Sequence, residues 1–225
     1  MKSNRDQDMR AEEQLGRFMD KYFYEKIKDK NKEDINFKRI MDKKIQLKGV
    51  DVCIEIENCQ YFIDEKAALY YSNAMIPTFA FELEYLQPLY REVVQGWFIN
   101  DELDTDFYML IWPNIKCEQR EGWKRKNLKY LQRDDFTIVE AMLIKKSVLR
   151  NRLEKNQLGK KRLLEYAREL RKTGNREEKI SDKIKIFYSY SLEEKPVNLV
   201  INKDMLKECA EAIFLISVDG YARIK

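Results

Sequence analysis

Two apolar runs joined by a short polar segment constrain the fold of this chain more than any other feature. The runs QLKGVDVCIEI and QYFIDEKAALYY are typical of β-strands, and the residues around 57–60 suit a connecting turn. Side chains alternate along a strand, so Asp64 and Lys66 are expected on one face and Glu65 on the other. If the two strands pair, Asp51 comes beside Asp64. Two carboxylates and one ammonium group would then meet in one pocket.

The composition narrows the chemistry that such a pocket can perform. The 225 residues include no histidine, which excludes Ser-His-Asp and Cys-His triads and His-based zinc sites. Neither GxxxxGK[ST] nor GxGxxG occurs in the sequence, so an ATPase or a dehydrogenase is disfavoured. Paired carboxylates supply hard oxygen ligands for Mg²⁺, and a nearby lysine can act on the attacking water or the phosphate. The pattern therefore favours metal-dependent hydrolysis of a phosphodiester.

Length and composition indicate a single α+β domain over residues 1–225. With 44% hydrophobic residues the chain can bury a real core, expected over residues 6–145 with a C-terminal elaboration over 146–225. No run approaches the roughly 18–20 apolar residues of a membrane span, and the N-terminus lacks the apolar core of a signal peptide. A cytoplasmic location without membrane association is therefore expected. Reduced thiols are expected as well, because CxxC spacing is absent among Cys53, Cys59, Cys117 and Cys209.

Hydrophobic periodicity predicts the order of the helices and strands. Helices are expected at residues 6–28, 146–155, 160–172 and 203–212. Strands are expected at residues 45–56, 60–70, 78–86, 136–144, 183–190, 197–201 and 214–218. Residues 96–100 and 105–113 are predicted to form a hairpin around an acidic turn, and residues 28–36 to form a solvated connector.

The order of a helix, a strand with Gly-x-Asp, a strand with Asp-x-Lys and a third strand resembles the PD-(D/E)XK nuclease superfamily. The matching residues are Asp51, Asp64 and Lys66, within a stretch from about residue 6 to residue 86. Val50 stands before Asp51 where the family pattern has proline. The resemblance implies a restriction-endonuclease-like fold, with a mixed central β-sheet flanked by helices. It also implies Mg²⁺- or Mn²⁺-dependent cleavage of nucleic acid, with DNA favoured over RNA.

The resemblance assigns roles to the central residues. Asp51 and Asp64 would hold the metal, with the backbone carbonyl of Glu65 as a further ligand. Lys66 would orient or help to deprotonate the attacking water and offset charge in the transition state. The alternative is an exposed cross-strand ion pair that contributes roughly 0.2–1 kcal/mol. Apolar neighbours on both sides of Asp64 weigh against that alternative, because an unpaired charge there is expensive.

Other acidic residues are candidates for the same metal site. Glu12 or Glu13 matches an additional helical acid that many family members carry, and Glu13 is a candidate ligand. Glu82 becomes a further ligand, or a partner of Lys66, if strand 78–86 lies beside strand 60–70. The alternatives are ordinary charges near a helix start, where the macrodipole favours acids, and a solvated strand face.

Basic residues gather in the second half of the chain, although the net charge is only +4. Such patches suit sequence-independent contact with a phosphate backbone, and the alternative for any single residue is a solvated face. A protein that binds nucleic acid or assembles without cleaving, and an interaction protein with an ordinary ion-pair network, remain rival hypotheses. Cutting both strands of a duplex with one site per chain would favour a homodimer. The candidate nucleic-acid contacts are Lys124, Arg125, Lys126, Lys160, Lys161 and Arg162.

Overall fold

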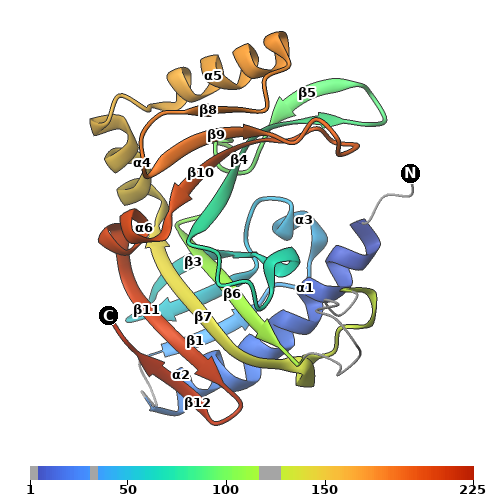
Figure 1. Cartoon of the computed structure of the whole chain (residues 1–225). Coiled ribbons are helices and arrows are strands. Elements are labelled where there is room, and N and C mark those ends of the chain that lie inside the picture. Colours follow the sequence, from blue (N-terminus) through green and yellow to red (C-terminus); the bar gives the residue numbers. More distant parts are fainter. Residues whose placement is uncertain (1–4, 31–34, 117–127) are drawn as a thin grey trace. The chain divides into compact units, whose positions relative to one another are not determined.

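The protein has an α+β fold built on two β-sheets, seen here in a computed structural model that describes residues 5–30, 35–116 and 128–225 (Figure 1). The chain divides into two compact units, and each unit is assembled from separate segments. The seven-strand unit comprises residues 2–76, 105–145 and 210–225, and the five-strand unit comprises residues 77–104 and 146–209. The α+β class agrees with the sequence. Residues 77–104, expected within the core, group with 146–209.

The sheet of the seven-strand unit is mixed, in the order β1-β2-β3-β6-β7-β11-β12. The parallel pair is β3–β6, and the other neighbouring strands are antiparallel. β1 begins inside the stretch that was predicted to be a connector, so that prediction was wrong at its C-terminal end. The strands are β1 (Ile35–Arg39), β2 (Val52–Ile56), β3 (Cys59–Ala67), β6 (Phe107–Ile115), β7 (Phe136–Lys145), β11 (Ala210–Ser217) and β12 (Gly220–Arg223).

The β2–β3 hairpin confirms the predicted pairing of the two apolar runs. Val52 pairs with Ile63, and Ile56 pairs with Cys59. The turn residues Glu57 and Asn58 both take positive φ angles, 49° and 65°, as a two-residue hairpin turn of type I′ requires. β2 is shorter than predicted, because the residues before it form a helical turn, α3 (Lys43–Gln46).

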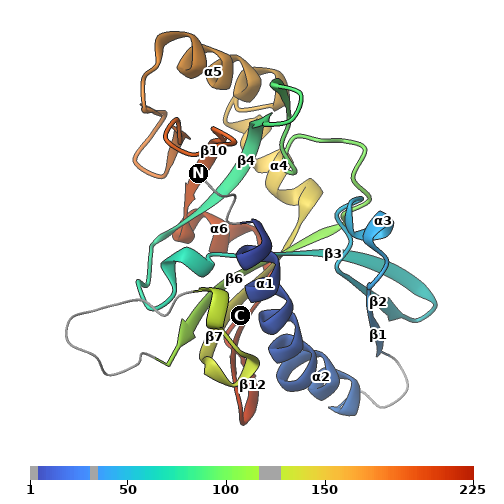
Figure 2. The same cartoon turned by 90° about the vertical axis from the view of Figure 1, so that its right-hand side faces the viewer.

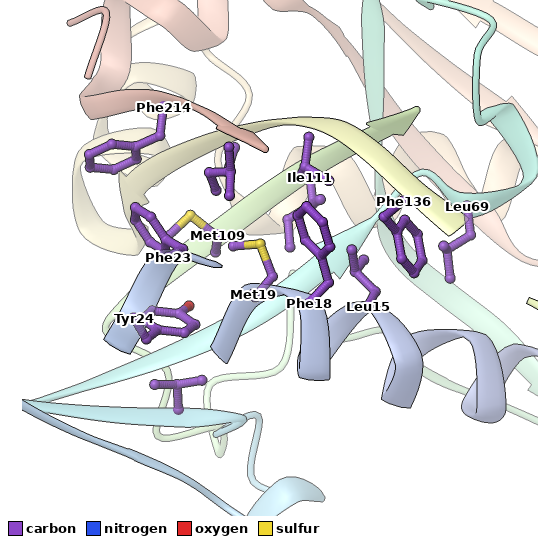
Figure 3. Close-up of a cluster of buried hydrophobic side chains, with 14 of the residues drawn as sticks. Leu15, Phe18, Met19, Phe23, Tyr24, Leu69, Met109, Ile111, Phe136 and Phe214 are labelled. Atoms are coloured by element: carbon purple, nitrogen blue, oxygen red, sulfur yellow. The ribbon is translucent and has the colours of Figure 1, made fainter. Parts of the chain in front are cut away.

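The N-terminal helical segment covers one face of this sheet (Figure 2). It consists of α1 (Arg5–Met19), a π-helical turn (Asp20–Tyr24) and α2 (Glu25–Lys30), in agreement with the predicted helix. Its apolar side chains recur at helical spacing and pack against the strands, as the cluster in Figure 3 shows. Members of this buried cluster include Leu15, Phe18, Met19, Phe23, Met109, Ile111, Phe136 and Phe214.

The sheet of the five-strand unit is antiparallel, in the order β5-β4-β10-β9-β8. Helix α5 buries Leu163, Ala167 and Leu170 and ends at Gly174, whose φ of 74° is the left-handed conformation that glycine adopts readily. The strands are β4 (Thr78–Gln87), β5 (Glu92–Gln95), β8 (Glu177–Lys179), β9 (Ile184–Tyr188) and β10 (Val197–Asn202). The helices are α4 (Lys146–Lys155), α5 (Lys160–Thr173) and α6 (Lys203–Cys209). Helices α4 and α5 confirm their predicted positions.

Two predicted strand arrangements were wrong. The strand at 78–86, expected beside strand 60–70, is β4, and it pairs with β5 and β10 in the other sheet. The hairpin of residues 96–100 and 105–113 does not form, because residues 96–100 make a turn in which Asn100 N–H donates to the Gly96 carbonyl. A Cβ on Gly96 would lie 2.5 Å from the Glu82 carbonyl oxygen, so this turn packs against β4 in a way that only glycine allows.

Short 3₁₀ turns complete the described structure, at Leu69–Tyr71, Leu128–Tyr130 and Arg133–Asp135. Within the described ranges, no helix has the length and apolar character needed to cross a membrane.

Candidate functional site

Asp51 and Asp64 lie opposite each other at one end of the β2–β3 hairpin. Asp51 immediately precedes β2, and its N–H donates to the carbonyl of Ile63 at 2.9 Å. Because Val52 pairs with Ile63, the next position along the ladder places Asp51 across from Asp64. Opposite residues of an antiparallel pair project from the same face, so the two carboxylates share one side of the sheet. The predicted juxtaposition of these two acids is therefore present.

Lys66 joins the same face, two residues beyond Asp64. Its Nζ lies 2.5 Å from Asp64 Oδ1. Asp64 is only 1% exposed, and its second oxygen, Oδ2, is buried without a hydrogen bond. A buried carboxylate oxygen that lacks a donor is costly, so this atom has unused capacity to bind a cation or a donor.

Backbone groups hold Asp51 at three points. Besides its own N–H bond, its carbonyl accepts from Ile40 N at 2.8 Å, and its carboxylate Oδ2 accepts from Glu65 N at 2.8 Å. Burial and the adjacent Asp64 raise the pKa of Asp51 to about 6, against the opposing effects of Lys66 and the Glu65 N–H. The two carboxylates are thus held together despite their mutual repulsion.

The charge state of Lys66 follows from the same neighbours. Burial lowers the pKa of Lys66, but Asp64 and Asp51 together outweigh burial and raise the pKa above its ordinary value. Lys66 is therefore an ammonium ion at neutral pH. It can donate hydrogen bonds and offset negative charge, and it is poorly suited to accept a proton in this state.

The helical acid near this cluster is Glu12. Glu12 is exposed on α1, yet desolvation raises its pKa, with Lys66 opposing the rise and Asp51 and Asp8 adding to it. Glu13, the candidate ligand, instead accepts a hydrogen bond from Arg17 at 2.6 Å on the exposed side of α1. Adjacent helical residues point about 100° apart, which separates these two acids.

The other candidate metal ligands are the Glu65 carbonyl and Glu82. The side chain of Glu65 projects from the opposite face of β3, where its Oε1 accepts from the Tyr24 hydroxyl at 2.9 Å and its Oε2 from Arg39 at 2.7 Å, so its backbone carbonyl is the group that remains a candidate ligand. Glu82 lies on β4 in the five-strand unit, so the strand adjacency on which its candidacy depended is absent. Among the described residues, no three or more His, Cys, Asp or Glu side chains are grouped so that they could hold a metal ion.

A second polar network occupies the helix-covered face of the hairpin, and the sequence reasoning missed it. Arg39 of β1 donates from Nε to Asp20 at 2.8 Å and from one terminal nitrogen to Glu65. Its guanidinium also stands 6.0 Å from the Tyr24 ring centre. A usable signal was present in the helix, because Glu12, Gly16, Asp20 and Tyr24 recur every four residues and are therefore expected on one face.

Comparison of the chain with family models, with curated proteins and with solved structures found no match.

The candidate nucleic-acid contacts are divided between described and undescribed parts of the chain. Lys124, Arg125 and Lys126 lie outside the described residues. Lys160, Lys161 and Arg162 form the first turn of α5. Lys160 pairs with Asp101 at 2.5 Å, and Arg162 pairs with Glu165 at 3.1 Å and lies 4.2 Å from the ring centre of Tyr166. Two of these three cations therefore already have partners within their own unit.

The cluster of Asp51, Asp64 and Lys66 has a defined chemical capacity. Two opposed carboxylates, one with an oxygen that lacks a donor, suit a divalent cation, which would relieve their repulsion. Mg²⁺ is commonly bound by one or two protein carboxylates, with water and substrate phosphate as its remaining ligands. Asp51 and Asp64 are the residues that could hold such an ion, and Lys66 is the adjacent cation.

Proposed function

We propose that this protein is a metal-dependent nuclease of the PD-(D/E)XK type that hydrolyses phosphodiester bonds in DNA. One observation carries the proposal. Asp51 and Asp64 are held opposite each other, Lys66 contacts one Asp64 oxygen, and the other Asp64 oxygen is buried without a hydrogen bond. A folded protein gains little stability from such an arrangement unless something binds there, because both burial and repulsion oppose it.

The architecture around the cluster also supports the proposal. An N-terminal helix, a hairpin carrying Asp51 and Asp64, and a mixed sheet are among the features that the resemblance to this superfamily implies, whereas the third strand of the pattern, β4, lies in the other sheet. The charges of Lys66 and Asp51 both influence the pKa of Glu12 on this helix. We therefore propose a restriction-endonuclease-like core for the seven-strand unit.

Each residue has a role in the proposed hydrolysis, in which water adds to phosphorus and one P–O ester bond breaks. Asp51 and Asp64 would hold Mg²⁺ or Mn²⁺, which supplies Lewis-acid stabilisation of the phosphoryl oxygens and of the attacking water. Lys66, protonated and held against Asp64, would donate to the water or to a phosphate oxygen as negative charge develops. Glu12 adds negative charge that favours a divalent cation beside Asp51.

Calorimetry with Mg²⁺ and Mn²⁺, together with cleavage of a short DNA duplex, tests this function. We expect wild type to bind metal and to cleave, and Asp64→Ala to lose both while remaining folded by circular dichroism. Asp182→Ala is the matched control, because Asp182 is an exposed acid that pairs with Lys179 in the five-strand unit. Cleavage retained in Asp64→Ala would contradict the assignment. Since substrate phosphate can complete such sites, the titration is repeated with a non-cleavable duplex present.

A non-catalytic nucleic-acid-binding protein is the second candidate, and one observation favours it. Lys66 already neutralises Asp64, and the described acids do not form a group of three around a common point. In that case DNA would bind with a strong dependence on salt, since phosphate contacts release counterions, and metal would change neither binding nor the DNA. Fluorescence anisotropy at several salt concentrations, with and without Mg²⁺, separates this candidate from the nuclease.

A further inference from the structure

Arg39, the last residue of β1, connects that strand with the N-terminal helical segment and with β3. Its Nε donates to both carboxylate oxygens of Asp20 at 2.8 Å, and one terminal nitrogen donates to Glu65 Oε2 at 2.7 Å. Its other terminal nitrogen lies 3.4 Å from the Gly16 carbonyl oxygen. The planar guanidinium thus contacts the N-terminal helical segment and β3 at the same time.

The Arg39–Glu65 ion pair joins β1 to β3 across β2, the strand that begins directly after Asp51. Arg39 is paired with Val52 of β2, and β2 is paired in turn with β3, which carries Glu65. The two residues also adjoin the groups that hold Asp51. Glu65 donates its own N–H to the Asp51 carboxylate, and Ile40, next to Arg39, donates its N–H to the Asp51 carbonyl. A movement of Arg39 or Glu65 would therefore move the hydrogen bonds that orient Asp51.

The same guanidinium sets the position of the helix that carries Glu12. Gly16 lies one turn after Glu12, and an added Cβ there would be 3.2 Å from Arg39 Cζ and from a terminal nitrogen. Asp20 lies one helical turn after Gly16, and its carboxylate accepts a hydrogen bond from Arg39 Nε. Glu12, Gly16 and Asp20 form a single stripe, so contacts at two of these positions constrain the third.

Stability alone is a poor explanation for this network. Buried ion pairs are often no more stabilising than apolar residues of similar volume, because desolvation offsets their attraction. The guanidinium fixes the directions of several hydrogen bonds at once, because its donors have a rigid planar geometry that one lysine ammonium cannot reproduce.

We propose that Arg39 is a positioning residue that acts through Glu65 and Gly16 to hold the Asp51 carboxylate and the Glu12 helix in register with Asp64. Its effect on the geometry of Asp51 stands on the contacts above. Its effect on cleavage rests on the proposed nuclease function.

Arg39→Lys and Gly16→Ala test this inference, with Arg17→Lys as the matched control. Arg39→Lys keeps the positive charge and loses the planar guanidinium with its fixed set of donors. Gly16→Ala keeps Arg39 but crowds its guanidinium, although alanine is the better helix former. Arg17 lies on the same helical segment in an exposed pair with Glu13, so the same Arg-to-Lys change there leaves the network intact.

The decisive readout is the backbone amide of Glu65, followed by NMR as its proton chemical shift and its hydrogen-exchange rate. We expect both to change in Arg39→Lys and Gly16→Ala, with faster exchange, and to match wild type in Arg17→Lys. We also expect kcat to fall roughly 10- to 100-fold in Arg39→Lys, as when an outer residue that orients a metal ligand is replaced. Gly16→Ala should show the same direction of change without a lower unfolding midpoint.

A Glu65 amide that is unchanged in Arg39→Lys would overturn the inference, even if kcat fell. If Arg39→Lys does not fold, Gly16→Ala decides the question by the same amide signal. Failure of the nuclease proposal looks different, because wild type would then cleave nothing while the Glu65 amide still responded to both variants.

Discussion

The two units of this protein place their charged residues differently. In the seven-strand unit, charges are drawn into the fold, and the side chains of Arg39 and Glu65 are only 20% and 11% exposed. In the five-strand unit, ion pairs such as Arg152–Glu208 lie at the surface, with both side chains almost half exposed. Exposed pairs contribute little to stability, whereas buried charges must be matched by partners in a defined geometry. The Arg39 network is therefore held in a defined geometry that exposed pairs such as Arg152–Glu208 do not require.

Glu84 and Arg171 are an exception within the five-strand unit. Glu84 is buried, and burial raises its pKa, with Arg171 and Arg168 opposing the rise. The closest charged atoms of the Glu84–Arg171 pair are 3.9 Å apart, and Arg171 instead donates to the carbonyls of Lys195 at 2.9 Å and of Glu84 at 3.4 Å. This looser pair differs from the tightly bonded Arg39 network, where every contact to a carboxylate is shorter than 3 Å.

Among the charged residues of the two units, Lys66 is the one whose replacement should lower the free energy of unfolding most. Lys66→Met leaves Asp51 and Asp64 without their cation, so we expect the free energy of unfolding to fall by about 3–5 kcal/mol at pH 8. Urea denaturation measures this loss. Added Mg²⁺ or Mn²⁺ should restore part of the stability, because the ion takes the place of the ammonium charge. No loss of stability would mean that the pair is less buried and less coupled than its geometry indicates.

Replacement of Arg39 should cause the next largest loss in the free energy of unfolding. Arg39→Met leaves Asp20 and Glu65 partly buried without a cation, and we expect a loss of about 3 kcal/mol in the free energy of unfolding. The triple variant Arg39→Met, Asp20→Asn, Glu65→Gln removes the charges together and should recover much of this loss. If the triple variant is no more stable than Arg39→Met, buried charge is not the cause.

Asp51→Asn should stabilise the protein without metal while it abolishes metal-dependent cleavage. The pKa of Asp51 is raised from 3.8 to about 6, so the folded state holds this proton more tightly than the unfolded chain. The free energy of unfolding therefore falls as pH rises from about 4 to about 6, by roughly 2–3 kcal/mol for this group. We expect Asn, which can still accept from Glu65 N–H, to remove that fall and to raise stability at pH 7. Thermal unfolding from pH 4 to pH 8 checks the sign.

The smallest effect is expected for the surface pairs of the five-strand unit. Arg152→Ala removes one exposed partner of Glu208, which also contacts Lys183, so the change should be below about 1 kcal/mol. It should also vanish in 1 M salt, where screening is nearly complete. A loss comparable to that of Arg39→Met would remove the contrast between the units.

The sequence was sufficient for elements whose signals are local. The β2–β3 hairpin followed from two apolar runs and a turn, and the same alternation put Asp64 and Lys66 on one face and Glu65 on the other. Helices α4 and α5 followed from 3.6-residue periodicity. The sequence was not sufficient for β1, because a five-residue strand that contains two charged residues shows too little hydrophobic alternation to be recognised. Arg39, which ends this strand, was therefore missed as well.

The hairpin, the long helices and the pairing of Asp51 with Asp64 could therefore be predicted from local patterns, because each depends on residues close together in the chain. Three features became known only from the fold: β6 lies between β3 and β7, β4 belongs to the other sheet, and the charge of Lys66 acts on Glu12 while Glu13 pairs with Arg17. Strand neighbours far apart in sequence are chosen by which surfaces can be buried together, and no local pattern records that choice. The orientation of a helix about its own axis is likewise set by packing, so a rotation of about 100° separates the directions of two adjacent acids.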